Sequence, residues 1–521
     1  MKKILALASA GVLALSLAAC GGDDDGGGGG AAGGTGEPWT LGTTDVVTAL
    51  DPAGAYDLGS STLHYAIYQS LLTIPAGENK PQGDAAESCE YTNPKTFVCT
   101  LREGLKFSNG DELTSSDVKY SFERNLKIAD PNGASTLLAS LKNIETPDDK
   151  TVKFNLKRPD TTFQFVLTHS STSIVDEEVF PDNKILPDSD VVGSGPYMMD
   201  DYESGQQATL KKSETYQGAN EGKAPLIFVK YYPESSNLKL AIQNDEVQVA
   251  WRNLSPTDLT DLEGNDSVDV LKGEGSEIRY WVWQLGTKVG KQKAIRQAVA
   301  QLIDRQAISD RAYEGTVDPL FSVVPPGFPG QTDSFKAKYG EASVDKAKAI
   351  LQKAGVKTPV DITLGYTPSH YGPNAVDEAT ELKSQLDDSG LFKATTKSAE
   401  WEQYQNLYKE NAYDLFILGW FPDFLDADNY LAPFFVDGGF YANNYSNPEI
   451  NDLVAKEQGT DDDAAREDAF GKIQEITAED VPTIPSWVGK NVAVTRPGIE
   501  GVQDTLDPAF IFRFWMVSYN G

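Results

Sequence analysis

The stretch LREGLKFSNG occupies residues 101–110, and a helix signal follows it a few residues later. Thr114 and Asp117 are three residues apart, so a hydroxyl and a carboxylate can satisfy the free N–H groups of a first helical turn. Apolar residues then recur at helical spacing: Val118, Phe122 and Leu126. This pattern predicts a helix directly after the quoted stretch.

Outside this region the chain alternates between helical and extended patterns. Apolar spacing predicts further helices at residues 294–303 and 344–354, the second of them stopped by Gly355. Runs rich in β-branched and aromatic residues predict strands at 39–50, 151–156, 278–285, 361–366 and 414–418. The pattern has no fixed repeat and is typical of a mixed α/β protein.

Length and composition exclude several classes of protein. The chain has 521 residues, of which 40% are apolar, and carries a formal net charge of −32. This length suits about three domains or two large lobes. The apolar content excludes a disordered acidic chain. The excess of carboxylates makes nucleic acid and anionic membrane surfaces poor partners for the folded body.

The N-terminus has the pattern of an export signal with a lipid anchor. Lys2 and Lys3 precede an apolar run at residues 4–19 that is short and rich in alanine. The run ends in LAACG, which resembles the lipobox of bacterial lipoproteins, with Cys20 as the lipidated residue. We therefore predict a signal peptide at 1–19 and a lipidated, flexible Gly/Asp linker at 20–37. A plain signal with an incidental cysteine is the alternative.

The other two cysteines suit a disulfide. Cys89 and Cys99 flank two short strand-like runs around an Asn-Pro turn, so their thiols can face each other across a hairpin. A disulfide is the usual state of such a pair outside the cytoplasm. A redox or metal role competes weakly, because no Cys-x-x-Cys spacing and no nearby histidine accompany the pair.

Motifs for catalysis are missing from the sequence. The three histidines, His64, His169 and His370, lie far apart along the chain. There is no His-Glu-x-x-His, no Gly-x-Ser-x-Gly and no phosphate-binding glycine loop. A non-enzymatic protein without a metal or cofactor is therefore expected, and a secreted hydrolase is the disfavoured alternative.

Five stretches together resemble a known family. They are residues 101–110 with Leu113-Thr114 and Asp117-Val118; VGSGPY at 192–197; RQA, IDR and YEG at 296–298, 303–305 and 313–315; DL and GWFPD at 414–415 and 419–423; and IP at 484–485. In this order and spacing they resemble the extracellular solute-binding proteins of family 5. These are the dipeptide, oligopeptide and nickel receptors of ABC importers.

The resemblance implies a fold and its division. The fold would be the two-lobed α/β fold of periplasmic binding proteins (type II, cluster C), with an extra inserted domain and a hinge of two crossover strands. Lobe I would comprise 38–55, 187–279 and 492–521; the inserted domain of that lobe would be 56–186, and lobe II would be 280–491. The ligand would lie in the cleft between the lobes.

The resemblance also points to ligand contacts. In the family's peptide receptors the Asp three positions after a Gly-Trp pair binds the α-ammonium of the ligand, and Asp423 occupies that position here. A loop aspartate that faces water is the alternative. Aromatic residues are expected around it: Trp420, Phe421, Trp401, Tyr404 and Trp283. A core role is an open alternative for Trp420, Trp401 and Tyr404, and at most one of Trp281 and Trp283 is expected to face the cleft. No residue could be assigned to the ligand carboxylate.

The resulting functional hypothesis is a monomeric lipoprotein on the outer face of the cytoplasmic membrane. It would capture di- or oligopeptides and deliver them to an ABC permease with its ATPase subunits. It would contact the membrane only through its lipid anchor and would bind no nucleic acid. The alternative is the same scaffold with a non-peptide solute, such as an oligosaccharide, chelated nickel or a cationic metabolite.

Overall fold

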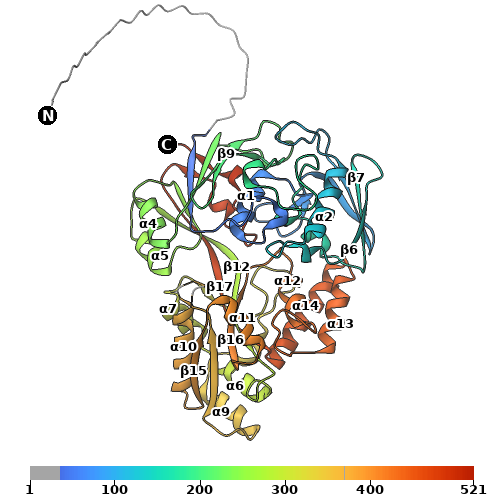
Figure 1. Ribbon diagram of the computed structural model, residues 1–521. Helices are drawn as coiled ribbons and strands as arrows, with labels where there is room; N and C mark the ends of the chain where they lie inside the picture. The colour runs from blue at the N-terminus through green and yellow to red at the C-terminus, as the bar shows by residue number, and fades with distance from the viewer. Residues whose placement is uncertain (1–35, 369, 373) are drawn as a thin grey trace, which may run out of the picture. The chain divides into compact units, whose positions relative to one another are not determined.

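Two long antiparallel strands, β12 (Asp269–Trp283) and β17 (Thr483–Thr495), cross the middle of the protein. The computed structural model describes residues 36–368, 370–372 and 374–521. The two strands pair from Asp269 opposite Thr495 to Val282 opposite Thr483. In Figure 1 they run between an upper half with β9 and α1 and a lower half with α10, β15 and α9. We call β12 and β17 the crossing strands.

The first lobe is built on one side of the crossing strands. From β17 the sheet continues in the order β11, β1, β10, β9 and β8. These are Val249–Trp251, Trp39–Thr43, Leu226–Tyr231, Gln207–Lys212 and Tyr197–Glu203, with helices α1 (Leu58–Ile67), α4 (Ser235–Gln243) and α5 (Pro256–Glu263). Trp39 and Trp251 pack against Phe512, so the C-terminal segment returns to this lobe.

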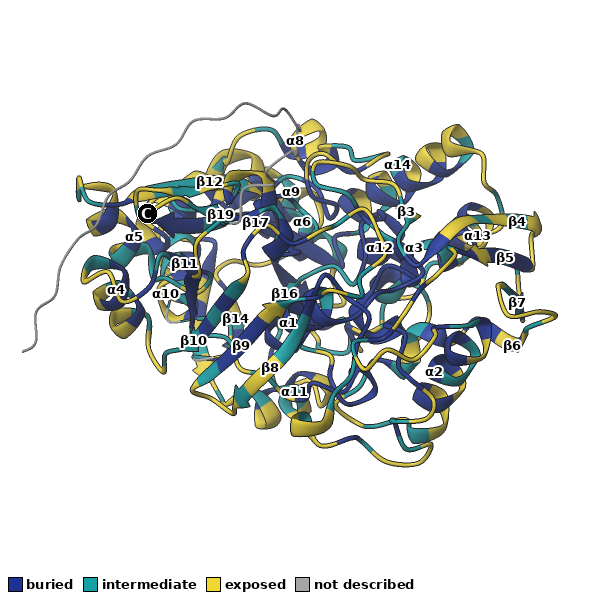
Figure 2. Ribbon diagram, turned by 90° about the horizontal axis from the view of Figure 1, so that it is seen from above, coloured by how far each residue is buried: buried dark blue, intermediate teal, exposed yellow. Residues whose placement is uncertain are grey.

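The second lobe extends the same sheet from β12. Its strands are β16 (Leu415–Trp420), β14 (Val360–Tyr366) and β15 (Phe392–Ser398), with β13 (Asp318–Pro319) beside β17. Its helices are α6 (Lys293–Leu302), α7 (Arg305–Ala312), α8 (Ser334–Tyr339), α9 (Val344–Lys353), α10 (Ala375–Asp388), α11 (Trp401–Lys409), α12 (Asp428–Phe435), α13 (Pro448–Gln458) and α14 (Asp463–Asp480). Central strands such as β16 and β17 are buried, whereas the outer faces of several helices are exposed (Figure 2).

Between β1 and β8 the chain forms a separate four-stranded antiparallel sheet. Its order is β4 (Ala86–Asn93), β5 (Thr96–Leu101), β7 (Thr151–Leu156) and β6 (Leu141–Glu145), accompanied by α2 (Ser115–Ile128) and α3 (Phe163–Val166). We call this stretch between β1 and β8 the inserted segment; residues near both of its ends, such as Leu63 and Phe180, belong to the core of the first lobe. Through α3 the segment also reaches the second lobe, where Phe165 stacks on Phe424 with ring centroids 6.2 Å apart.

Cys89 and Cys99 face each other across β4 and β5 and form a disulfide. The bridge closes a loop with a sequence separation of 10 residues. Replacing both cysteines by Ser is expected to lower the free energy of unfolding by about 3 kcal/mol, because the unfolded chain regains the entropy of the open loop. Urea unfolding of the oxidised protein and of the double variant measures this difference. Equal midpoints for the two proteins would contradict the prediction.

Several expected elements have the bounds that the sequence indicates. Thr114 is the N-cap of α2 and forms a capping box with Asp117, and β7 covers residues 151–156. The strand expected at 39–50 was predicted too long, since β1 ends at Thr43. Beyond it, Asp45 pairs with Arg252 at 2.9 Å, and the backbone N–H of Thr48 donates to Ser60 Oγ at 2.8 Å. The Ser60 hydroxyl thus accepts from the backbone of this segment where a neighbouring strand would otherwise do so.

The predicted signal peptide, Cys20 and most of the Gly/Asp linker lie outside the described residues. In the part of the chain that the structure describes, no helix combines the length and the apolar character needed to cross a bilayer.

Candidate ligand site between the lobes

The loop after β16 carries Asp423 and is held by the first turn of α12. Asn429 Oδ1 accepts hydrogen bonds from the indole Nε1 of Trp420 at 3.0 Å and from the backbone N of Asp423 at 2.8 Å. Asn429 Nδ2 in turn donates to Asp423 Oδ2 at 2.9 Å. One asparagine therefore fixes both the aromatic ring and the carboxylate of this loop.

The Asp423 carboxylate reaches the first lobe. Its Oδ1 accepts a hydrogen bond from the hydroxyl of Tyr56, which lies just before α1. Burial raises the pKa of Asp423 to about 6, although the hydrogen bonds from Asn429 and Tyr56 act in the opposite direction. Within the described part of the chain Asp423 forms no ion pair. The result is a half-buried carboxylate between two lobes without a compensating cation.

Phe421 also crosses to the first lobe. Its ring meets Phe510 edge to face, with centroids 5.3 Å apart, and the Arg252 guanidinium lies over it at 5.4 Å. A pocket of about 150 Å³ opens here, lined by Phe421 together with Arg252, Glu277, Trp487 and Phe510. Side chains from both lobes and from the crossing strands thus enclose this space.

Trp401 lies in a different aromatic group. Its ring stacks on His370 with centroids 3.8 Å apart and meets Tyr371 edge to face at 5.5 Å. Burial and, to a smaller extent, the positive charge of Arg279 together lower the pKa of His370 to about 4. The imidazole is therefore neutral at pH 7, and the stack with Trp401 is an uncharged one.

Tyr404 and Trp283 require correction, because both are fully buried in the core of the second lobe. The hydroxyl of Tyr404 donates to the backbone oxygens of Gly365 at 3.1 Å and Ile417 at 2.8 Å, which anchors α11 to the sheet. Trp281 and Trp283 are two residues apart on β12 and share a face. Trp281 Nε1 donates to Glu378 of α10 at 2.9 Å. Neither Trp faces the cleft.

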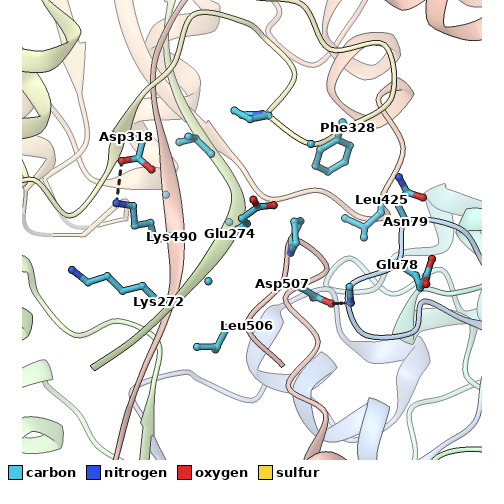
Figure 3. Close-up of a pocket in the computed structure, with 18 of the residues that line it drawn as sticks. Glu78, Asn79, Lys272, Glu274, Asp318, Phe328, Leu425, Lys490, Leu506 and Asp507 are labelled. Carbon is cyan, nitrogen blue, oxygen red and sulfur yellow. Dashed lines mark hydrogen bonds and ion pairs between the residues drawn. The ribbon is translucent and has the colours of Figure 1, made fainter. Parts of the chain in front are cut away.

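A larger cavity of about 910 Å³ lies along the crossing strands (Figure 3). Residues of both lobes line it, including Phe328 and Leu425 of the second lobe and Leu506 of the first. Its charged groups are largely satisfied: Lys490 pairs with Asp318 at 3.0 Å, and Asp507 accepts from the backbone N of Gly77 and pairs with Arg513. None of the ligand contacts predicted from the sequence lines this cavity.

Sequence reasoning missed the partners of Asp423 and Phe421. Tyr56 is 367 residues away from Asp423 along the chain. Arg252 lies beyond the end of β11, where its φ of 67° places it in the left-handed region. No local pattern links either residue to the 419–423 motif. Asn429 is the exception, since it follows that motif at the start of a helix.

Residues 80–442 match the family model described as "Bacterial extracellular solute-binding proteins, family 5 Middle". The chain belongs to this family. Family 5 comprises solute-binding proteins and not enzymes. The predicted two-lobed α/β fold is confirmed, because structures of such binding proteins match over nearly the whole chain.

Curated relatives of this family 5 protein include two from Escherichia coli K12. The probable D,D-dipeptide-binding periplasmic protein DdpA is 27% identical over 446 residues, which are 83% of this chain and 84% of the relative. The glutathione-binding protein GsiB is 26% identical over 484 residues, 89% of this chain and 92% of the relative.

Among solved structures, DppA from Helicobacter pylori in complex with the peptide STSA matches with a TM-score of 0.79. It is 22% identical, and the match covers 94% of this chain and 99% of that one. HbpA2 from Haemophilus parasuis matches with a TM-score of 0.83 at 21% identity, covering 93% of this chain and 100% of that one. These likenesses establish the fold.

Proposed function

We propose that this family 5 protein is the receptor of an ABC importer for peptides. It acts as a monomer, is tethered through lipidated Cys20 to the outer face of the cytoplasmic membrane, and delivers its cargo to a permease with ATPase subunits. The cargo is a di- or oligopeptide held between the lobes. The crossing strands serve as the hinge, and the lobes divide near residues 279 and 491 as the sequence suggests.

The observation that carries the proposal is the Asp423 carboxylate. It lies where the lobes meet and has no cation beside it in the described part of the chain. A peptide α-ammonium supplies the missing charge, and in a closed cleft of low dielectric such a pair attracts strongly. The ammonium would take the place of the Tyr56 hydroxyl as the hydrogen-bond donor to Oδ1.

The aromatic surroundings support the same cargo. Trp420 and Phe421 precede Asp423 closely in the chain and offer rigid aromatic surface, which gives contact area at low cost in conformational entropy. The relatives named above support a peptide as well, since their names give a D,D-dipeptide and glutathione as ligands.

Blocking the amino group of the peptide is the direct test. A library of di- and tripeptides is expected to bind at least about 30-fold more tightly than the same library after N-acetylation, because acetylation removes the charge that Asp423 pairs with. N-methylated peptides are the matched control, since they carry similar extra bulk but keep the positive charge. Isothermal titration calorimetry measures all three; equal affinities for the free and acetylated libraries would refute the assignment.

A further inference from the structure

The inserted segment is fastened to the first lobe. Its ends belong to the core of that lobe, where Leu50 and Phe180 pack in one cluster with Trp39 of β1. Within the segment, Arg124 of α2 pairs with Asp51, and its Nη1 lies 2.9 Å from Asp51 Oδ1. Both side chains of this ion pair are at most 1% exposed. Breaking a buried ion pair is strongly unfavourable, so we expect the segment to move together with the first lobe.

The same segment also contacts the second lobe, at the C-terminal end of α13 (Figure 1). The backbone N of Thr161 donates to the carbonyl of Gln458 at 3.0 Å, and its Oγ1 donates to the carbonyl of Glu457 at 3.3 Å. Arg158 Nη1 donates to Gln458 Oε1. The last carbonyls of a helix have no partner inside the helix, so Thr161 caps α13 from a distant part of the chain. Thr161 is 7% exposed, and its bonds are therefore shielded from water.

The buried part of this contact lies at residues 158–165, which we call the clasp. The Phe165 ring of the clasp stacks on Phe424 of the second lobe, and both side chains are buried. A second contact, the ion pair of Lys80 with Asp463 at 2.9 Å, is exposed and therefore contributes little. Because polar contacts are stronger away from water, we expect the clasp to provide most of the attraction between the segment and the second lobe.

The clasp is separate from the pockets between the lobes but is connected to the Asp423 loop. None of residues 158–165 lines the pocket of about 150 Å³ or the cavity of about 910 Å³. Gln458, which accepts from the clasp, donates through Nε2 to Asp428 Oδ1 at 3.0 Å. The next residue, Asn429, donates to Asp423 Oδ2 at 2.9 Å. Hydrogen bonds and one peptide bond thus join the clasp to the carboxylate that the proposed function uses.

We propose that the clasp keeps the lobes closed over the cargo and sets the rate at which the cargo leaves. This inference rests on the proposed function, in which the crossing strands are the hinge. When the lobes separate, α13 leaves with the second lobe while the clasp stays with the first, so the hydrogen bonds of Arg158 and Thr161 have to break. They add to the free energy of opening without touching the cargo. Cargo enclosed between the lobes leaves only after opening, so the clasp slows its release.

Thr161→Val is the direct test, because it removes the hydroxyl donor and keeps the size of the side chain. The probe is the tripeptide of the library that binds wild type most tightly, labelled with tritium and chased with excess unlabelled peptide. Thr161→Val is expected to release it about three- to tenfold faster than wild type, which corresponds to the loss of one buried hydrogen bond. Arg158→Met is expected to release it about twofold faster, since that side chain is 53% exposed.

Thr168→Val is the matched control. Thr168 is a buried threonine of the same segment, and its Oγ1 donates to the carbonyl of Phe165 at 2.8 Å, inside the segment. In urea both valine variants are expected to lose similar stability, but only Thr161→Val is expected to speed release. Thr161→Ser keeps the hydroxyl and is expected to release the peptide at the wild-type rate. Should Thr161→Val not fold, Arg158→Met carries the comparison.

Hydrogen exchange gives a second measurement. The amide hydrogen of Thr161 exchanges only when its bond to the Gln458 carbonyl breaks. If opening of the lobes breaks that bond, saturating peptide is expected to slow exchange in the fragment with residues 158–165 by about tenfold, although the peptide does not touch it. Strand β7 is the control, because its amides pair within the four-stranded sheet and are expected to exchange at the same rate with and without peptide.

The outcomes separate this inference from the proposed function. If wild type binds the peptide but Thr161→Val releases it no faster than Thr168→Val, the role of the clasp is refuted while peptide binding stands. Exchange at residues 158–165 that does not respond to peptide refutes the role as well. If wild type binds no peptide of the library, the proposed function fails, and this inference fails with it.

Discussion

Replacing Arg466 by Met is expected to lower the free energy of unfolding by about 3–5 kcal/mol at pH 7. Arg466 of α14 makes a bidentate pair with Asp426, with both N–O distances 2.8 Å, and its Nη2 also donates to Glu457 Oε2 at 3.0 Å. All three side chains are buried. Removing the guanidinium leaves the Asp426 carboxylate buried without its partner, which is the costly way to break such a pair.

The protonation state of Glu457 makes the loss of stability specific to the removal of Arg466. Burial raises the pKa of Glu457 far above its ordinary value, and the neighbouring Asp428 carboxylate raises it further. Glu457 is therefore neutral at pH 7 and shares a hydrogen bond with Asp428. Glu457→Gln keeps a neutral group of the same shape and is expected to cost less than about 1 kcal/mol.

Urea unfolding at pH 7 of wild type, Arg466→Met and Glu457→Gln measures this contrast. The cluster also borders the inserted segment, since the backbone N of Thr161 donates to the carbonyl of Gln458 at 3.0 Å. Arg466→Met is thus expected to loosen the contact between that segment and the second lobe. Comparable losses in the two variants would show that Glu457 is charged and that our account of the cluster is wrong.

Local signals predicted the local structure well. The Thr114–Asp117 capping box and the apolar spacing behind it gave α2, since both act within one or two helical turns. The end of β1 could not be predicted in the same way. Asp45 leaves the sheet because it pairs with Arg252, which is 207 residues away. Such a contact has no signature in the residues next to Asp45.

The candidate site was predictable only where it is one continuous stretch. The GWFPD motif located Asp423 and Phe421, and both reach the first lobe. Trp283 was misplaced because β12 lies between β16 and β17 in a sheet buried on both faces. In such a strand both faces carry apolar residues, so the alternation of apolar and polar residues no longer distinguishes a core face from a cleft face.

Asp423→Asn is expected to weaken binding of the free-amino peptide library by about 30-fold or more while it stabilises the ligand-free protein. Both effects follow from the charge of this half-buried carboxylate. The folded-state pKa of Asp423, about 6, exceeds the unfolded value of about 3.9. Between these pH values the folded protein binds more protons than the unfolded chain, so its stability falls as pH rises from about 4 to about 6. Asparagine carries no charge and so removes the free-energy cost of holding the Asp423 carboxylate ionised in the folded protein, which is on the order of 2 kcal/mol.

Three measurements test the Asp423 prediction. In calorimetric titrations wild type is expected to lose affinity by up to about tenfold per pH unit below 6, as the carboxylate is protonated, whereas Asp423→Asn is weak at every pH. In urea at pH 7 the variant is expected to be more stable than wild type without peptide.

Asp414→Asn is the control. Asp414 is a half-buried carboxylate of the same lobe, and its Oδ2 accepts a hydrogen bond from the backbone N of Thr363 at 2.9 Å. If Asp423→Asn both binds more weakly and is less stable, Asp423 serves to hold the loop together. If Asp423→Asn binds more weakly but is more stable, Asp423 is a charge that binds ligand and destabilises the ligand-free protein.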